Sequence, residues 1–233
     1  MSDFESESYS ENEWEERGDL AWNEFDWERY LREQDDVLHR YLAHYEKLRD
    51  DPGRIDEVAH LMGWDDGPAA AGAETADDGA APGPAPIELP PAASHSPFEP
   101  YTLHQNPVFV ATKAIYLSLK RSWERIAGDQ EQGTQARALA LQTSLFRGEE
   151  HAILGVQALD LGDYAMAVSL FKRALQELNR TLAMATEPEL AAVRRLAAWR
   201  DDAFPRLFDL REIWLRVIAE CREELARRVD DES

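Results

Sequence analysis

Cysteine is almost absent from this sequence: Cys221 is the only one in 233 residues, which excludes an intrachain disulfide. No apolar run approaches the length of about 18 residues that a membrane-spanning helix needs. The chain also lacks a glycine-rich phosphate loop, a nucleophile elbow and a Cys/His metal-binding pattern. The sequence therefore discloses no reaction, and we expect no cofactor and no metal.

Basic residues are scarce in the first hundred positions. The formal net charge is −21, of which residues 1–66 contribute −14, residues 67–100 contribute −5 and residues 101–233 contribute −2. Such acidity repels nucleic acid and anionic membrane surfaces, so we expect neither as a partner. The first 16 residues show no basic stretch followed by an apolar one, so a cytoplasmic location is expected. The asymmetry predicts an acidic arm attached to a nearly neutral globular domain.

The acidic arm divides into a tail and a helical hairpin. Residues 1–18 are rich in Ser, Glu and Asp and are predicted to be a disordered acidic tail. Apolar residues then recur at spacings near three and four over residues 20–49, which predicts an amphipathic helix. A shorter helix follows over residues 55–63. We expect an acidic, aromatic helical hairpin over residues 19–64.

A segment poor in core-forming side chains separates the arm from the rest. Of the 31 residues from 67 to 97, 21 are Ala, Pro or Gly. Prolines favour extended segments, and a linker this long is unusual inside one compact domain. We therefore predict a flexible, disordered linker over residues 65–100 and a separate α-helical domain over residues 101–233.

Apolar stripes at helical spacing run through residues 101–233 and predict six helices, a helical bundle or short solenoid. On two of these helices the stripes include Leu139 with Phe146 and Leu154 with Leu161. Pro205 suits the first turn of the final helix, with Asp202 as its cap. The expected breaks between helices are at Gly128, Gly133, Gly148, Gly162-Asp163, Pro188 and Pro205.

One helical hairpin resembles a tetratricopeptide (TPR) unit, over residues 151–180. The residues that carry the resemblance are Leu154-Gly155, Ala158, Gly162-Asp163-Tyr164, Ala167, Phe171 and Ala174-Leu175. The resemblance implies two helices joined by a Gly-Asp-Tyr turn, with small residues that allow close approach. Neighbouring 34-residue windows do not repeat the pattern, so the hairpin packs on non-repeat helices or on divergent repeats. The alternative is that Gly-Asp-Tyr is a favourable helix–helix turn in any protein.

Few residues have a type and spacing that would suggest a metal-binding or catalytic site. Asp36 with His39 and Glu57 with His60 have the carboxylate-x-x-His spacing of di-iron bundles, which puts both ligands on one helix face. Those bundles need two further carboxylates on long core helices, whereas these pairs lie in the short arm, so we favour structural roles. Cys221 falls on an apolar stripe, which favours packing over nucleophilic chemistry.

Aromatic residues crowd the acidic arm. Trp22, Phe25 and Trp27 are candidate partner-binding residues, because large aromatics in an acidic segment are typical of docking into a groove with a basic rim. The alternative is that Trp22, Trp27 and Tyr30 close the core of the hairpin. If the arm docks on the chain's own domain, the complementary surface is expected to be basic. The candidate clusters are Arg121 with Arg125, Arg194 with Arg195, and Arg227 with Arg228.

These observations favour a non-enzymatic protein–protein interaction or adaptor protein, with an acidic docking arm tethered to a helical domain. The expected partner is another protein with a basic groove, and intramolecular docking of the arm is a further expectation. One alternative is a helical-bundle enzyme, or a protein that binds a metal or small molecule at an unrecognised site. Another is an acidic nucleic-acid mimic that occupies a basic protein.

Overall fold

The computed structural model of the protein describes residues 22–64, 103–127, 135–188 and 193–231. This part of the chain is helical and has no β-strand, so the all-α prediction is confirmed. The tail and the linker predicted from the sequence lie outside the described residues. The helices are α2 (Glu24–Lys47), α3 (Arg54–Leu61), α4 (Pro107–Ala127), α5 (Gln135–Asp160), α6 (Tyr164–Ala185) and α8 (Arg194–Asp231), with a 3-10 turn η2 (Leu103–Gln105) before α4.

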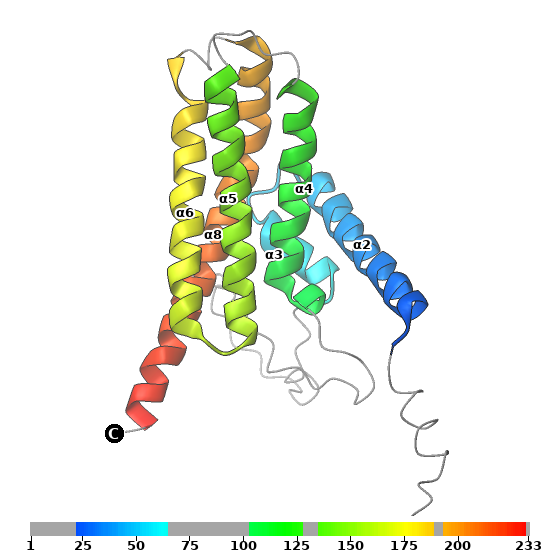
Figure 1. Ribbon diagram of the computed structural model, residues 1–233, viewed down its shortest axis with the longest axis vertical. Helices are drawn as coiled ribbons and strands as arrows, with labels where there is room; N and C mark the ends of the chain where they lie inside the picture. Colours follow the sequence, from blue (N-terminus) through cyan, green and yellow to red (C-terminus); the bar gives the residue numbers. More distant parts are fainter. Residues whose placement is uncertain (1–21, 65–102, 128–134, 189–192, 232–233) are drawn as a thin grey trace, which may run out of the picture.

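Four long helices form an up-down-up-down bundle (Figure 1). Helices α4, α5, α6 and α8 alternate in direction, and α8 continues past the bundle toward the C-terminus. Helix α2 lies obliquely against α4, with its N-terminal end pointing away from the bundle, and α3 follows beside it. The short α2–α3 connection turns the chain back, as Asp51-Pro52-Gly53 favours.

Aromatic side chains dominate the core. Trp123, Trp214, Tyr116 and Phe171 are fully buried. The Trp214 ring stacks on Tyr116 with the ring centroids 6.2 Å apart, and its indole N–H donates to the Thr112 hydroxyl at 3.2 Å. Large rings bury much apolar area, and their polar atoms need partners. The same core contains residues of the arm, namely Tyr41, Tyr45 and Val58, so α2 and α3 are packed onto the bundle.

Two predicted helix breaks are wrong. Gly148 lies inside α5, and Pro205 lies inside α8 rather than in its first turn. A proline in a helix removes the hydrogen bond to the carbonyl four residues earlier. Here that carbonyl belongs to Asp201, which is exposed, so solvent can replace the missing donor. Asp202 is likewise not a helix cap; its carbonyl oxygen and its carboxylate both contact Arg206.

Gly148 allows α4 and α5 to approach closely. A Cβ atom at this position would lie 2.6 Å from the Tyr116 hydroxyl oxygen, and Tyr116 is fully buried. We expect Gly148→Ala to destabilise the protein by about 1 kcal/mol, because overpacking outweighs the gain in helix propensity. The measurement is chemical denaturation of Gly148→Ala, Tyr116→Phe and the double variant. Removing the hydroxyl should make Gly148→Ala neutral or stabilising, and additive effects would contradict this explanation.

Of the two apolar stripes predicted between residues 139 and 161, Ala158 is buried but the large side chains do not face the core. Leu139, Phe146, Leu154 and Leu161 are all exposed. The face of α5 that packs inward instead carries Ala138, Leu141, Leu145, Ala152, Val156 and Leu159. Since α5 is apolar on both sides, periodicity alone does not distinguish its inner face from its outer one.

Candidate functional site

The N-terminal end of α2 is a well-defined helix start. The Asn23 side chain accepts hydrogen bonds from the backbone N–H groups of Phe25 (2.8 Å) and Asp26 (3.1 Å). The Asp26 carboxylate accepts in turn from the Asn23 N–H at 3.3 Å. This capping box satisfies N–H groups that a helix end leaves unpaired. It fixes the directions in which the neighbouring aromatic side chains leave the helix.

The aromatic residues at this end form a small cluster of their own. Trp22, Trp27 and Tyr30 contact one another edge to face, with ring centroids 5.0–6.1 Å apart. Tyr30 is buried and also contacts His104 of η2, at 6.0 Å between centroids. Trp27 remains 41% exposed and Phe25 is 76% exposed. Of the three predicted anchors, two therefore share one cluster, and Phe25 points into solvent.

Acidic residues surround the aromatic cluster. Residues 24–36 contain six Asp or Glu residues and two Arg residues. Both arginines are paired within α2: Arg29 contacts Asp26 at 2.9 Å, and Arg32 contacts Glu28 at 2.8 Å. Exposed pairs of this kind contribute little to stability. Their consequence is that the rim around the aromatic residues is predominantly negative.

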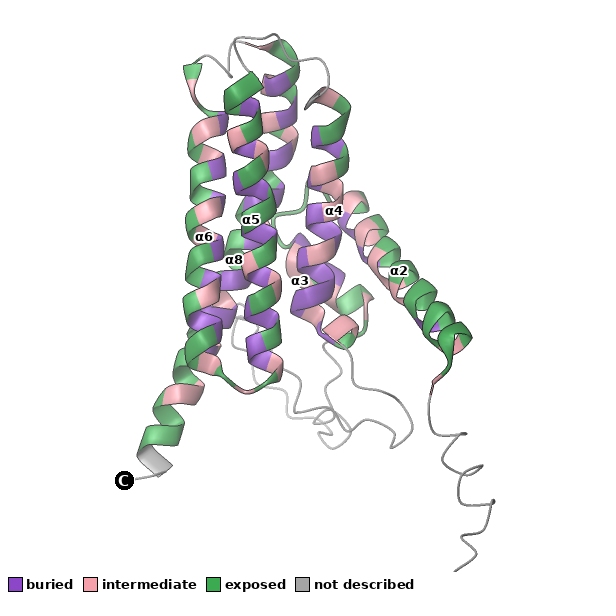
Figure 2. Cartoon of the chain, viewed as in Figure 1, coloured by how far each residue is buried: buried purple, intermediate pink, exposed green. Residues whose placement is uncertain are grey.

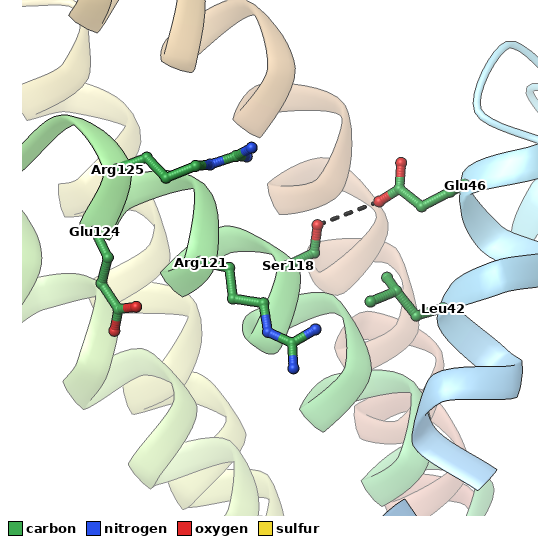
Figure 3. A pocket seen from close by; sticks show the side chains of 6 residues that line it. All are labelled: Leu42, Glu46, Ser118, Arg121, Glu124 and Arg125. Carbon is green, nitrogen blue, oxygen red and sulfur yellow. Dashed lines mark hydrogen bonds between the residues drawn. The ribbon is translucent and has the colours of Figure 1, made fainter. Parts of the chain in front are cut away.

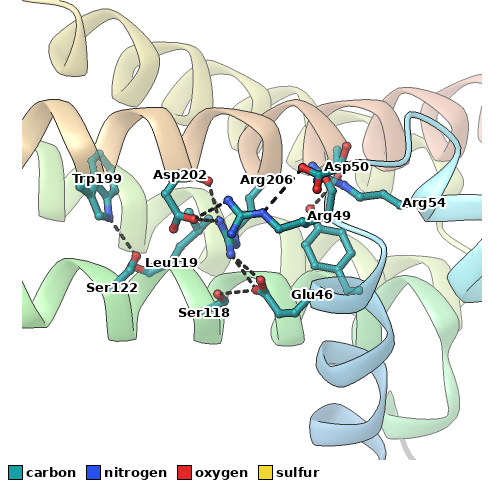
Figure 4. A network of polar contacts seen from close by, with 12 residues as sticks. Glu46, Arg49, Asp50, Arg54, Ser118, Leu119, Ser122, Trp199, Asp202 and Arg206 are labelled. Carbon is teal, nitrogen blue, oxygen red and sulfur yellow. Dashed lines mark hydrogen bonds and ion pairs between the residues drawn. The ribbon is translucent and has the colours of Figure 1, made fainter.

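The opposite end of the arm is held by three ion pairs with α8, which we call the charge ladder: Glu46–Arg206, Arg54–Asp209 and Asp56–Arg216. The Arg206 Nη2 atom contacts both oxygens of Glu46, at 2.7 and 2.8 Å (Figure 4). Helix α8 supplies positive, negative and positive groups, and the arm supplies the opposite signs. A shift of the arm along α8 would bring like charges together, so the ladder specifies the register.

The middle pair of the charge ladder is the most buried. The side chains of Arg54 and Asp209 are 8% and 17% exposed. Asp209 also accepts a hydrogen bond from the Tyr45 hydroxyl, and the Arg54 guanidinium lies 4.7 Å from the centre of the Tyr45 ring. Burial, and then the charge of Asp209, raise the pKa of Tyr45 far above its ordinary value, so this tyrosine stays neutral and donates its proton.

The basic clusters predicted as docking surfaces contribute no residue to the charge ladder. Arg121 and Arg125 line an open groove of about 650 Å³ between α2 and α4 (Figure 3), and an Arg121 Nη atom lies 3.5 Å from His39. Arg125 and Arg195 line a second groove beside it. Arg228 instead covers the Tyr164 ring, 4.5 Å from its centre.

The residues that hold the arm in place, Arg206 and Arg216, were not predicted. One local signal existed: on a helix, Arg206, Asp209 and Arg216 share one face. What the sequence does not reveal is that Arg54 belongs to the arm and Asp209 to the bundle. Docking is thus not simply an acidic arm on a basic surface.

Of the TPR-like residues, Gly155, Phe171 and Ala174 lie where α5 and α6 face each other, whereas Leu154 is exposed on the outer face of α5. Gly162 has a φ of 71°, which suits glycine, and the Asp163 side chain caps α6 by accepting from the Met166 N–H at 2.9 Å. A Cβ atom at Gly155 would lie 3.0–3.2 Å from three atoms of the Phe171 ring. Ala167 and Ala174 are fully buried, and Tyr164 is half-buried under Arg228. The helices have 26 and 22 residues, together longer than a 34-residue repeat.

The remaining ionisable groups do not form a metal centre within the described ranges. No group of three or more His, Cys, Asp or Glu side chains there is arranged to hold a metal ion. The buried carboxylate of Glu149 contacts Lys113, at 3.2 Å, and Lys120. Such a contact compensates a charge inside the bundle. Among the helices described, none combines the length and apolar character needed to cross a bilayer.

Cys221 is buried on α8, and its pKa is raised to about 11 by burial and then by the charge of Glu220. The thiolate is the reactive form, so we expect native Cys221 to react with a thiol reagent at pH 8 at least about a hundredfold more slowly than an ordinary exposed cysteine. The measurement compares reaction rates in buffer and in denaturant. Fast modification of the native protein would contradict the packing role.

Comparison with known proteins gives no match to a family model, to a curated protein or to a solved structure. The function is therefore inferred from the geometry of the arm and the bundle.

Proposed function

We propose that this protein is a non-enzymatic, cytoplasmic interaction or adaptor protein, and that the N-terminal end of α2 binds a partner protein. One observation carries the proposal. Helix α2 is fixed at its C-terminal end by the charge ladder, whereas its other end points away from the bundle with Phe25 and Trp27 exposed. Because these aromatic side chains are exposed, they contribute little to the core of the bundle and are available to contact a partner.

Physical considerations favour binding at this end. Aromatic side chains supply a large contact area with few rotatable bonds, and they often dominate interfaces. The capping box and the charge ladder order the helix beforehand, so binding costs less conformational entropy. Because acidic residues surround the aromatic cluster, the partner surface we propose is an apolar groove with a basic rim. Neither catalysis nor nucleic-acid mimicry is favoured by a specific arrangement among the described side chains.

Replacing Phe25 and Trp27 together with Ala should weaken partner binding by about tenfold or more, because a tenfold change needs about 1.4 kcal/mol and a single aromatic hot-spot residue contributes about 2 kcal/mol or more. The full chain is used to capture partners, and the affinity for a purified partner is then measured by calorimetry at two salt concentrations. The matched control is Phe208→Ala, a residue of similar exposure on α8. Thermal denaturation should show that neither variant unfolds the bundle. Undiminished binding by the double variant would reject this site.

A further inference from the structure

An apolar stripe runs along the outer face of α5. We call it the α5 stripe: Leu139, Phe146, Leu154 and Leu161, which are 63%, 36%, 41% and 85% exposed. The intervals of seven, eight and seven residues are close to two helical turns each, so the four side chains share one face over about 33 Å. In Figure 2, exposed positions recur along α5 between buried and intermediate ones. Exposed polar residues, namely Thr143, Glu150 and Gln157, alternate with the four apolar residues on the same face. A row of large exposed apolar side chains on one helix face is typical of a contact surface.

The spacing of the α5 stripe is symmetric about residue 150. Phe146 and Leu154 lie four residues on either side of it, and Leu139 and Leu161 lie eleven residues on either side. Turning α5 end over end about this point therefore superimposes the stripe on itself. Two such helices packed antiparallel would place Leu139 against Leu161 and Phe146 against Leu154 of the other copy. A surface that is complementary to itself is what a two-fold interface requires.

The charges at the centre of the α5 stripe agree with antiparallel pairing. Arg147 and Glu150 are exposed on α5, and neither makes an ion pair with another described residue. An antiparallel pair centred on residue 150 places the two Glu150 side chains opposite each other at the two-fold axis, with Arg147 of each copy beside Glu150 of the other, so the cluster of two Arg and two Glu residues is neutral overall. Lys120 of α4 already covers the Phe146 ring, 4.7 Å from its centre.

We propose that the α5 stripe is a homodimer interface, in which α5 of one copy packs antiparallel on α5 of a second copy. The proposal is independent of the partner site on α2, because the stripe lies on a different helix. In the dimer the four exposed apolar side chains are covered, and the single helical hairpin gains a neighbouring hairpin. The dimer would also present two α2 ends, so a partner with two sites would be bound by both.

Sedimentation of the full chain over a concentration series tests the dimer. The wild-type chain should show a monomer–dimer equilibrium, and Phe146→Glu and Leu154→Glu should each weaken it by about tenfold or more. Arg147→Glu and Glu150→Arg should each weaken it too, whereas the double reversal should restore it. The control Leu215→Glu, at an exposed apolar position on α8, should leave it unchanged. Circular dichroism confirms that each variant is folded.

Disulfide trapping tests the antiparallel direction. In the proposed dimer Leu139 of one copy faces Leu161 of the other, close enough for a disulfide between cysteines at these positions. A mixture of Leu139→Cys and Leu161→Cys chains should therefore cross-link efficiently under mild oxidation, and neither variant alone should do so. A wild-type chain that remains monomeric at every concentration, or a dimer insensitive to both stripe substitutions, would overturn the proposal. Cross-linking by each single variant alone would overturn the antiparallel arrangement.

Discussion

Arg54→Ala should lower the free energy of unfolding by about 3–5 kcal/mol, the usual cost of breaking a buried ion pair. Asp209 would lose its ion-pair partner at a mostly buried position, and among the described residues the Tyr45 hydroxyl would remain as its hydrogen-bond partner. The Arg54 side chain also covers the Tyr45 ring and donates to the Arg49 carbonyl at 2.7 Å. These contacts connect α2, α3 and α8, so their loss affects the docking of the whole arm. Chemical denaturation of the full chain measures the change.

The matched control for this substitution is Arg32→Ala. Arg32 also forms an ion pair, with Glu28 at 2.8 Å, but the two side chains are 75% and 57% exposed. We expect a loss of no more than about 0.5 kcal/mol, because solvent screens exposed pairs. Hydrogen exchange should show the loss in Arg54→Ala concentrated in α2 and α3. Equal effects of the two substitutions would mean that burial of the charge ladder does not matter.

Ala174→Trp should destabilise the protein by about 1–3 kcal/mol, because the bundle has no room for a large ring between α6 and its neighbours. Ala174 is fully buried on α6, and nearby Gly155 and Phe171 show how closely α5 and α6 pack. An indole at this position must displace packed side chains or push the helices apart. Thermal denaturation measures the effect as a lower melting temperature.

The control for this prediction is Arg173→Trp, at the adjacent exposed position of α6. It adds the same ring outside the core, and we expect a change within about 0.5 kcal/mol. An unchanged melting temperature for Ala174→Trp would show that this alanine is not enclosed. The TPR-like spacing would then have no role in packing α5 against α6.

Several features were predictable because they depend on neighbouring residues. The turn at Gly162 and Asp163 needs a glycine with positive φ followed by a capping side chain, and these two residues are adjacent in the sequence. The reversal between α2 and α3 is similarly local. Gly148 and Pro205 were misinterpreted for the opposite reason. As local signals they interrupt helices, but Gly148 is needed for the close contact with Tyr116, and Pro205 removes the helical donor only from the carbonyl of Asp201, an exposed residue.

The sequence by itself determined the all-helical architecture, because helical spacing of apolar residues and turn residues at helix ends are local properties. Only the tertiary structure decided which face of each helix packs against the core. Helix α5 is apolar on two sides, so the identity of its inner face depends on the helices packed around it. The pairing of Arg54 with Asp209 joins positions 155 residues apart. Such a contact arises when two helices meet in space, and no local pattern specifies it.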